Sequence, residues 1–185
     1  MFAYYDGSGP EEIFKQIKKL HELRRDAAAR AVSGDRAMIE ALAREALRPD
    51  GVRDHVGVEL LQDRASRNSA SFDAVFHGIC PGGRCNEGGK KIAAGKFEAV
   101  WRERACGACR FRVTGPRFLA GMVDRADLLM VEIQMSKERE DTLSTQYQQE
   151  SDLLVKRQIQ SEIRAEQKLQ LNLQNEWQIG HNMIQ

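Results

Sequence analysis

The sequence contains few of the residues that build β-rich or membrane proteins. Aromatic residues make up only 6% of its 185 residues, while 30% are charged, and this balance favours a soluble helical chain over a barrel or sandwich. No apolar run approaches the roughly 18 residues that a membrane span needs. The N-terminus also lacks the basic segment and apolar run of a signal peptide. We therefore expect a mainly α-helical, cytoplasmic protein with no membrane segment.

Helix-breaking residues are absent from most of the C-terminal third. Neither glycine nor proline occurs in the 58 residues between Gly121 and Gly180, and apolar residues recur there at spacings of three, four or seven. The pattern predicts one long helix over residues 121–185, on the order of 87 Å for the uninterrupted stretch at about 1.5 Å per residue. So long a helix cannot lie wholly on a small body, and we expect most of it to project.

The apolar stripe of this long helix predicts a coiled coil. We expect the chain to self-associate through its first part, by the residues Met122, Ala126, Leu129 and Ile133. Further along, polar residues occupy positions that a strict heptad would make apolar, namely Ser136, Glu140 and Glu150. Pairing is therefore expected early in the helix, and the late part departs from the heptad pattern.

Residues 1–70 read as a helical segment. The run Ser8-Gly9-Pro10-Glu11 supplies a cap, a helix-starting proline and an acidic first turn. It predicts a helix that ends near Ser33-Gly34. A second helix is predicted over residues 35–47 and a third over residues 54–65.

Residues 71–120 hold all four cysteines and eight glycines, with no room for a helix of ordinary length. Cys80 and Cys85 form one close pair, and Cys106 and Cys109 form another, 20 residues later. Two such pairs on glycine-containing turns are typical of a structural zinc site with four thiolate ligands, in a zinc-ribbon-like module. The alternatives are four ordinary thiols in a reducing cytosol, or a disulfide pair. His77 is a candidate substitute ligand.

The cysteine-rich segment is also basic, with nine Lys and Arg against four Asp and Glu in residues 71–119. These cations either offset the charge of a zinc–thiolate centre or contact phosphate groups. As a strand, the run Arg110-Phe111-Arg112-Val113 would bury its two apolar residues and direct both guanidinium groups outward. The predicted contacts to DNA phosphates, without base recognition, are Arg102, Arg104, Arg110, Arg112 and Arg117.

The cysteine motifs resemble a known family. The strings GICPGGRCNEGG, residues 78–89, and CGACRFRVTGPRFL, residues 106–119, resemble the cysteine-rich C-terminal region of tyrosine-recombinase-like integrases from bacterial mobile elements, the gamma-mobile-trio group. The resemblance covers residues 72–120 closely, and a long helix afterwards fits it. It implies a role in DNA integration and recombination, and it makes residues 1–70 the tail end of a recombinase-like catalytic domain with linker helices.

The resemblance also implies a remnant nucleophile near the N-terminus. Tyr5 matches the catalytic tyrosine of the family, with Tyr4 as the alternative, because Tyr5 directly precedes the polar turn. The Arg and His-x-x-Arg elements that should come before it are missing, and His21-Glu-Leu-Arg24 follows the tyrosine instead. A phenol needs cationic groups and a base to attack a phosphate, so we expect the chain to be inactive alone.

Together these features predict a C-terminal fragment or split part of an integrase, with an accessory role in DNA contact and self-association. An upstream-encoded integrase half would then supply the missing catalytic groups. The alternative is a stand-alone, zinc-stabilised protein-interaction module without a DNA role. Salt dependence separates the two, because binding through phosphates weakens steeply as salt is added.

Overall fold

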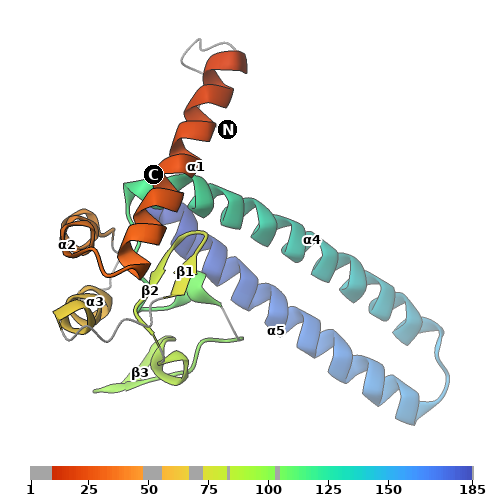
Figure 1. The fold of residues 1–185 in the computed structure, drawn as a ribbon. Helices are drawn as coiled ribbons and strands as arrows, with labels where there is room; N and C mark the ends of the chain where they lie inside the picture. The colour runs from red at the N-terminus through yellow and green to blue at the C-terminus, as the bar shows by residue number, and fades with distance from the viewer. Residues whose placement is uncertain (1–9, 48–55, 67–72, 83, 103–104, 185) are drawn as a thin grey trace.

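The computed structural model describes residues 10–47, 56–66, 73–82, 84–102 and 105–184 (Figure 1). These residues form five α-helices and two small antiparallel sheets of two strands each, which confirms the mainly α-helical fold. Within the described ranges, none of the helices combines the length and the apolarity needed to cross a membrane.

The three N-terminal helices lie where the sequence predicts them. They are α1 (Pro10–Val32), α2 (Arg36–Glu45) and α3 (Val56–Ser66). Between α1 and α2 the chain turns at Gly34, whose φ of +81° is a conformation that other residues rarely adopt. Asp35 then caps α2, because its carboxylate accepts a hydrogen bond of 3.1 Å from the backbone N–H of Met38.

The cysteine-rich segment consists of short strands and 3₁₀ turns. Strand β1 (Asp73–Val75) pairs with β2 (Gly78–Cys80), and β3 (Lys91–Ala93) pairs with β4 (Lys96–Phe97). The 3₁₀ turns are η2 (Cys85–Glu87), η3 (Cys106–Ala108) and η4 (Pro116–Phe118). Strands of two or three residues bury little apolar surface, so this segment needs other sources of order.

One hydrophobic core joins the N-terminal helices to the cysteine-rich segment. The helices contribute apolar side chains from α1, α2 and α3, and the cysteine-rich segment adds residues from β2, from the stretch after the last cysteine and from η4. The buried members are Ala27, Ala31, Met38, Ile39, Leu42, Leu61, Ile79, Val113 and Phe118. The two segments therefore fold against each other, and the domain boundaries at residues 70 and 120 stay predictions.

A long C-terminal helix is confirmed, but the stretch predicted as a single helix is divided in two. Helix α4 (Leu119–Gln149) and helix α5 (Leu153–Ile184) form an antiparallel hairpin that extends away from the body (Figure 1). The turn needs neither glycine nor proline, because side chains satisfy its backbone. Glu150 accepts hydrogen bonds from the N–H groups of Ser151 and Asp152, and Asp152 accepts one of 2.7 Å from Leu154 at the start of α5.

The apolar stripe of α4 is used within the chain. Met122 is 2% exposed and Leu129 is 1% exposed, because α5 returns along the same face of α4. Ala126 and Ile133 are half-buried on this face. The face of α4 that is predicted to mediate self-association is therefore covered by α5 of the same chain. Met122 and Leu129 are buried there and are not available to a second chain.

The polar positions of the seam have polar partners on α5. Ser136 is fully buried and donates a hydrogen bond of 2.6 Å to Glu166. One turn further along, Glu140 accepts hydrogen bonds of 2.8 Å from Gln167 and 3.0 Å from Gln170. The late part of the stripe thus pairs through hydrogen bonds where a strict heptad would use apolar contacts.

Glu140 should make the hairpin sensitive to acid. Hydrogen bonds from Gln167 and Gln170, together with Lys137, lower the pKa of Glu140 from 4.5 to about 2. A carboxyl group with a lowered folded-state pKa stabilises the fold above pH 4.5 and loses that effect as the pH falls towards 2. We expect the thermal midpoint to fall over this window, and to fall less in Glu140→Gln, as followed by circular dichroism.

The matched control is Asp127→Asn, which removes an exposed carboxylate of α4 that makes no hydrogen bond or ion pair in the described structure. It should retain the acid sensitivity of the parent chain. Equal acid sensitivity in Glu140→Gln and the parent would show that the Glu140 contacts do not stabilise the hairpin.

Candidate functional site

The four cysteines lie on three short segments of the backbone, one strand end and two 3₁₀ turns. Cys80 ends strand β2, Cys85 opens turn η2, and Cys106 opens turn η3, which Cys109 closes. In the η2 turn the carbonyl of Cys85 accepts hydrogen bonds from Gly88 and from Val100, at 3.4 and 2.8 Å. In the η3 turn the N–H of Cys109 donates to the carbonyl of Cys106 at 3.2 Å.

Backbone hydrogen bonds draw these pieces together. The N–H of Arg110 donates to the carbonyl of Gly88 at 2.9 Å, which ties the η2 turn to the chain leaving Cys109. Gly88 lies so close that a Cβ there would be 2.9 Å from the sulfur of Cys109. On the other side, Ile79 and Val113 exchange two hydrogen bonds of 2.8 and 2.9 Å, which places Cys80 beside the same stretch.

The sulfurs lie within electrostatic range of one another. Burial, reinforced by the neighbouring Cys80, Cys109 and Cys85, raises the pKa of Cys106 to about 11. Burial also raises the pKa of Cys109, although hydrogen bonds from the backbone N–H groups of Phe111 and Arg112 act in the opposite direction. All four cysteines are free thiols, so the structure contains no disulfide between them.

The donor set has the chemistry of a structural zinc site, but the geometry does not establish one. Among the residues that the structure describes, no three His, Cys, Asp or Glu side chains are grouped so that they could hold a metal ion. Four soft sulfur donors on glycine-containing turns, with N–H groups directed at one sulfur, fit Zn²⁺. The sulfurs are not grouped as a metal would require, and zinc stays a prediction.

A buried carboxylate connects the cysteine-rich segment to the hairpin. Glu176 on α5 is 1% exposed and accepts hydrogen bonds of 3.0 and 2.8 Å from Arg125 on α4. It accepts another of 3.2 Å from the indole N–H of Trp101. Arg125 also bonds Glu132 at 3.1 Å, and Glu132 pairs with Arg102 at 2.7 Å. The charges of this five-residue network are paired, as buried charges require.

The same carboxylate lies against the second cysteine turn. A Cβ at Gly107, between Cys106 and Cys109, would overlap the side chain of Glu176. Gly107 therefore has to lack a side chain for the end of α5 to pack on the turn. A glycine between two cysteines is typical of a metal-binding turn. Here the glycine is also required for the packing of α5 on the turn.

His77 lies between the cysteine-rich segment and the α4–α5 hairpin. It is 6% exposed, and neither ring nitrogen has a hydrogen-bond partner within the described part of the chain. It lines a cavity of about 10 Å³, with room for about one water molecule, beside Arg112, Arg125 and Glu176. Burial and the two arginine charges lower its pKa to about 3, so the ring is neutral at physiological pH. Its role as a substitute metal ligand stays a prediction.

The arginines predicted to contact DNA are largely engaged within the chain. Arg117 bonds both carboxylate oxygens of Glu45 at 2.8 and 3.0 Å, and Arg102 pairs with Glu132 as described above. Arg104 lies outside the described residues. Phe111 and Val113 are each 2% exposed, as predicted.

The prediction that both guanidinium groups of this strand point outward is wrong. Arg112 turns inward, donates to the sulfur of Met183 at 3.3 Å and has a pKa that burial lowers to about 10. The Arg110 guanidinium stacks 3.4 Å from the centre of the Phe97 ring. The run has only one backbone bridge, at Val113, so strand alternation does not set these directions.

The tyrosines of the predicted nucleophile, Tyr4 and Tyr5, lie outside the described residues. Arg24 of the His-x-x-Arg string lies 3.8 Å from Asp124 on α4, with its guanidinium over the ring of Phe76. This arginine therefore helps to hold α1 on α4.

Comparison with protein-family models, curated proteins and solved structures gives no significant match. The resemblance to the integrases therefore rests on the sequence motifs alone.

Removing Glu176 should destabilise the whole chain. Glu176→Ala removes the acceptor of the half-buried Trp101 indole and one of the two carboxylates that pair with the half-buried Arg125, and losing hydrogen bonds to a charged group in this way costs about 2 kcal/mol or more. Equilibrium urea unfolding would measure the loss. The control, Glu87→Ala, breaks an exposed pair with Arg84 at 3.7 Å and should cost less than about 1 kcal/mol. Similar losses in both variants would refute the anchoring role of Glu176.

Proposed function

We propose that the chain is a zinc-stabilised interaction module, in which the cysteine-rich segment anchors a helical hairpin that docks onto protein. The observation that carries this proposal is the Glu176 network, which fixes the returning end of α5 against both α4 and the second cysteine turn. An element held so firmly at one end, while its other end extends from the body (Figure 1), is suited to present a surface at a fixed orientation.

The hairpin carries apolar side chains that no part of the described chain covers. On α4, Leu128, Val131 and Met135 follow one another at spacings of three and four, and each is more than half exposed. Near the turn, Leu153 and Leu154 are each 74% exposed. Apolar surface gathered on one element in this way is typical of an interaction site.

Zinc should supply the order that the short strands cannot. We expect about one zinc ion per chain, bound by the thiolates of Cys80, Cys85, Cys106 and Cys109, because two thiolates from each pair complete a tetrahedral site. A chelator should then abolish hydrogen-exchange protection between residues 80 and 109. Elemental analysis of protein purified without chelators, together with thiol titration, measures the metal directly.

The control for this experiment is the chelator applied to a variant with all four cysteines replaced by serine. This variant should bind no zinc and should already lack protection in the segment. A parent chain that contains no zinc and has four freely titratable thiols would refute the metal centre.

A second candidate function is contact with DNA phosphates in an integrase, favoured by the β3–β4 hairpin. Lys90, Lys91 and Lys96 are exposed there and form no ion pair within the described part of the chain. These lysines, unlike Arg102 and Arg117, are available to phosphate. In this role an upstream-encoded integrase half would supply the Arg and His-x-x-Arg elements, and Tyr5 would be the nucleophile.

Replacing the three lysines together with alanine tests the DNA role. If they contact phosphates, DNA affinity should fall for all sequences, and the slope of log affinity against log salt should shrink by up to about three units, one per contact. Fluorescence anisotropy over a salt series measures the slope. Arg117→Ala, which removes an arginine paired with Glu45, should leave the slope unchanged. If the zinc-loaded parent shows no measurable DNA binding, the DNA role is refuted and only the protein-interaction role stands.

A further inference from the structure

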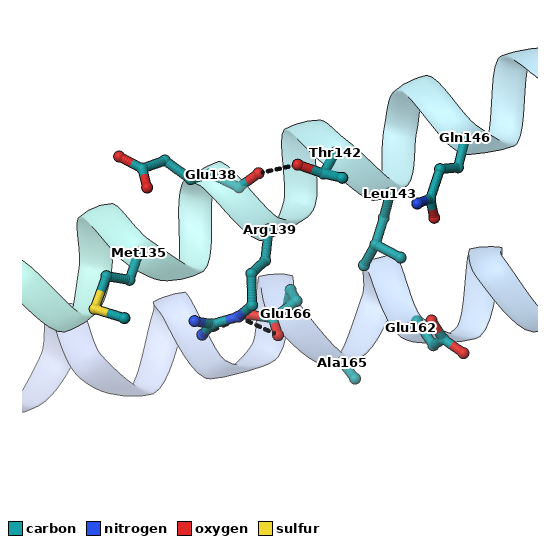
Figure 2. A pocket seen from close by; sticks show the side chains of 9 residues that line it. All are labelled: Met135, Glu138, Arg139, Thr142, Leu143, Gln146, Glu162, Ala165 and Glu166. Carbon is teal, nitrogen blue, oxygen red and sulfur yellow. Dashed lines mark hydrogen bonds and ion pairs between the residues drawn. The ribbon is translucent and has the colours of Figure 1, made fainter.

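Two features of the described surface differ in the kind of partner that their charges favour. The first is a groove of about 700 Å³ between α4 and α5, with side chains of both helices around it (Figure 2). Glu138 and Glu162 line this groove, and so does Arg139, which is paired with a further carboxylate at 3.0 Å. The second is the exposed part of the β3–β4 hairpin, residues 90–96, whose only charged residues are lysines. Charge of one sign favours an anionic partner for the β3–β4 hairpin, whereas the mixed charges of the groove favour no particular partner.

The base of the β3–β4 hairpin is fixed to the cysteine-rich segment. Phe97 at the end of β4 is half-buried, and the guanidinium of Arg110 lies 3.4 Å from the centre of its ring. The backbone N–H of Glu98 donates a hydrogen bond of 2.9 Å to the carbonyl of Lys90. Beyond these contacts every residue from 90 to 96 is exposed, and β3 lies at the edge of the molecule (Figure 1). Glu98 is acidic, so it marks the limit of the part that suits an anionic partner.

The dimensions of the β3–β4 hairpin fit the major groove of duplex DNA. Neighbouring strands lie about 4.8 Å apart, which makes a two-stranded hairpin roughly 9 Å wide once the backbone atoms of both edges are included. The major groove is about 12 Å wide and admits such a hairpin, whereas the minor groove is only about 6 Å wide. The three residues of β3 span about 10 Å at about 3.3 Å per residue, and the major groove is about 8.5 Å deep. The hairpin is therefore long enough to reach the base edges.

The side chains of the exposed part match the chemistry of this groove. Lys90 and Lys91 lie at the start of β3, and Lys96 opens β4. Cations from both strands can therefore reach the phosphates on either side of the groove. Ile92, the middle residue of β3, is apolar and 59% exposed, and the major groove presents an apolar group in the C5-methyl of thymine. Gly95 in the turn has a φ of +69° and no side chain, so the tip can approach the base edges closely.

We propose that the β3–β4 hairpin enters the major groove of duplex DNA, with Ile92 against a thymine methyl group and the lysines on the phosphates of both strands. The proposal rests on the second candidate function, phosphate contact by these lysines, and adds to it the groove and the apolar contact. Phosphate contacts position a protein on DNA without distinguishing bases. Ile92 supplies a contact that depends on the base.

Base analogues that change one groove at a time test the proposal on the full chain. In a duplex with both A·T and G·C pairs, deoxyuridine in place of thymidine removes a methyl group from the major groove, and deoxyinosine in place of deoxyguanosine removes an amino group from the minor groove. Fluorescence anisotropy should show an affinity about threefold lower for the uracil duplex, because one buried methyl contact is lost. The inosine duplex should bind as the unmodified one does. Ile92→Ala should bind the thymine and uracil duplexes equally.

The matched control is Ile17→Ala, which truncates an isoleucine of α1 that is 46% exposed and should keep the preference of the parent for thymine. A parent chain that binds the thymine and uracil duplexes equally, or an Ile92→Ala variant that still prefers thymine, would overturn the proposal. So would a loss of affinity confined to the inosine duplex, which would place the contact in the minor groove. A parent that binds none of the duplexes would refute the second candidate function itself, before any preference between bases is measured.

Discussion

The carboxylate of Glu176 is the constraint on which the arrangement of this molecule depends. A carboxylate that is 1% exposed must have its charge and lone pairs satisfied, and here the partners come from two different segments, Arg125 on α4 and Trp101 in the cysteine-rich segment. The requirement that Gly107 lack a side chain follows from the same group. Helix α5 therefore cannot leave its place beside α4 without exposing or unpairing buried charges, and the hairpin inherits its orientation from the cysteine turn.

The hairpin shows how a chain can satisfy an apolar stripe that looks intermolecular in the sequence. A heptad-like pattern specifies only that another helix should cover the stripe, and it does not specify whose helix. The turn at Glu150 and Asp152 supplies that helix from the same chain. The polar positions then become partners of α5, as in the hydrogen bond from Ser136 to Glu166. What remains for other molecules is a neighbouring face, which includes Leu128, Val131 and Met135.

Signals that act within a few residues predict the N-terminal helices, whereas contacts between distant segments leave no such signal in the sequence. Caps and apolar spacing predicted α1, α2 and α3, because those signals act within a few residues. The sequence gives no stop signal after Gln149, because a turn built on the carboxylates of Glu150 and Asp152 contains neither glycine nor proline. The spacing of the cysteine pairs predicts a shared metal site, and that site stays a prediction. The Glu176 network has no such signal, because Trp101, Arg125 and Glu176 are far apart in the sequence and none belongs to a motif.

The arginines of the basic segment show why a charge count does not by itself define a binding surface. Nine cations against four anions in residues 71–119 suggested a phosphate-binding face, but that count omits carboxylates from other segments. Glu45 from α2 takes up Arg117, and Glu132 from α4 takes up Arg102. An arginine already held by a carboxylate in two hydrogen bonds would have to exchange that partner for a phosphate, with little net gain. The cations of this segment that form no ion pair with a described residue include Lys90, Lys91 and Lys96 on the β3–β4 hairpin, so a phosphate-binding surface would have to be built from them.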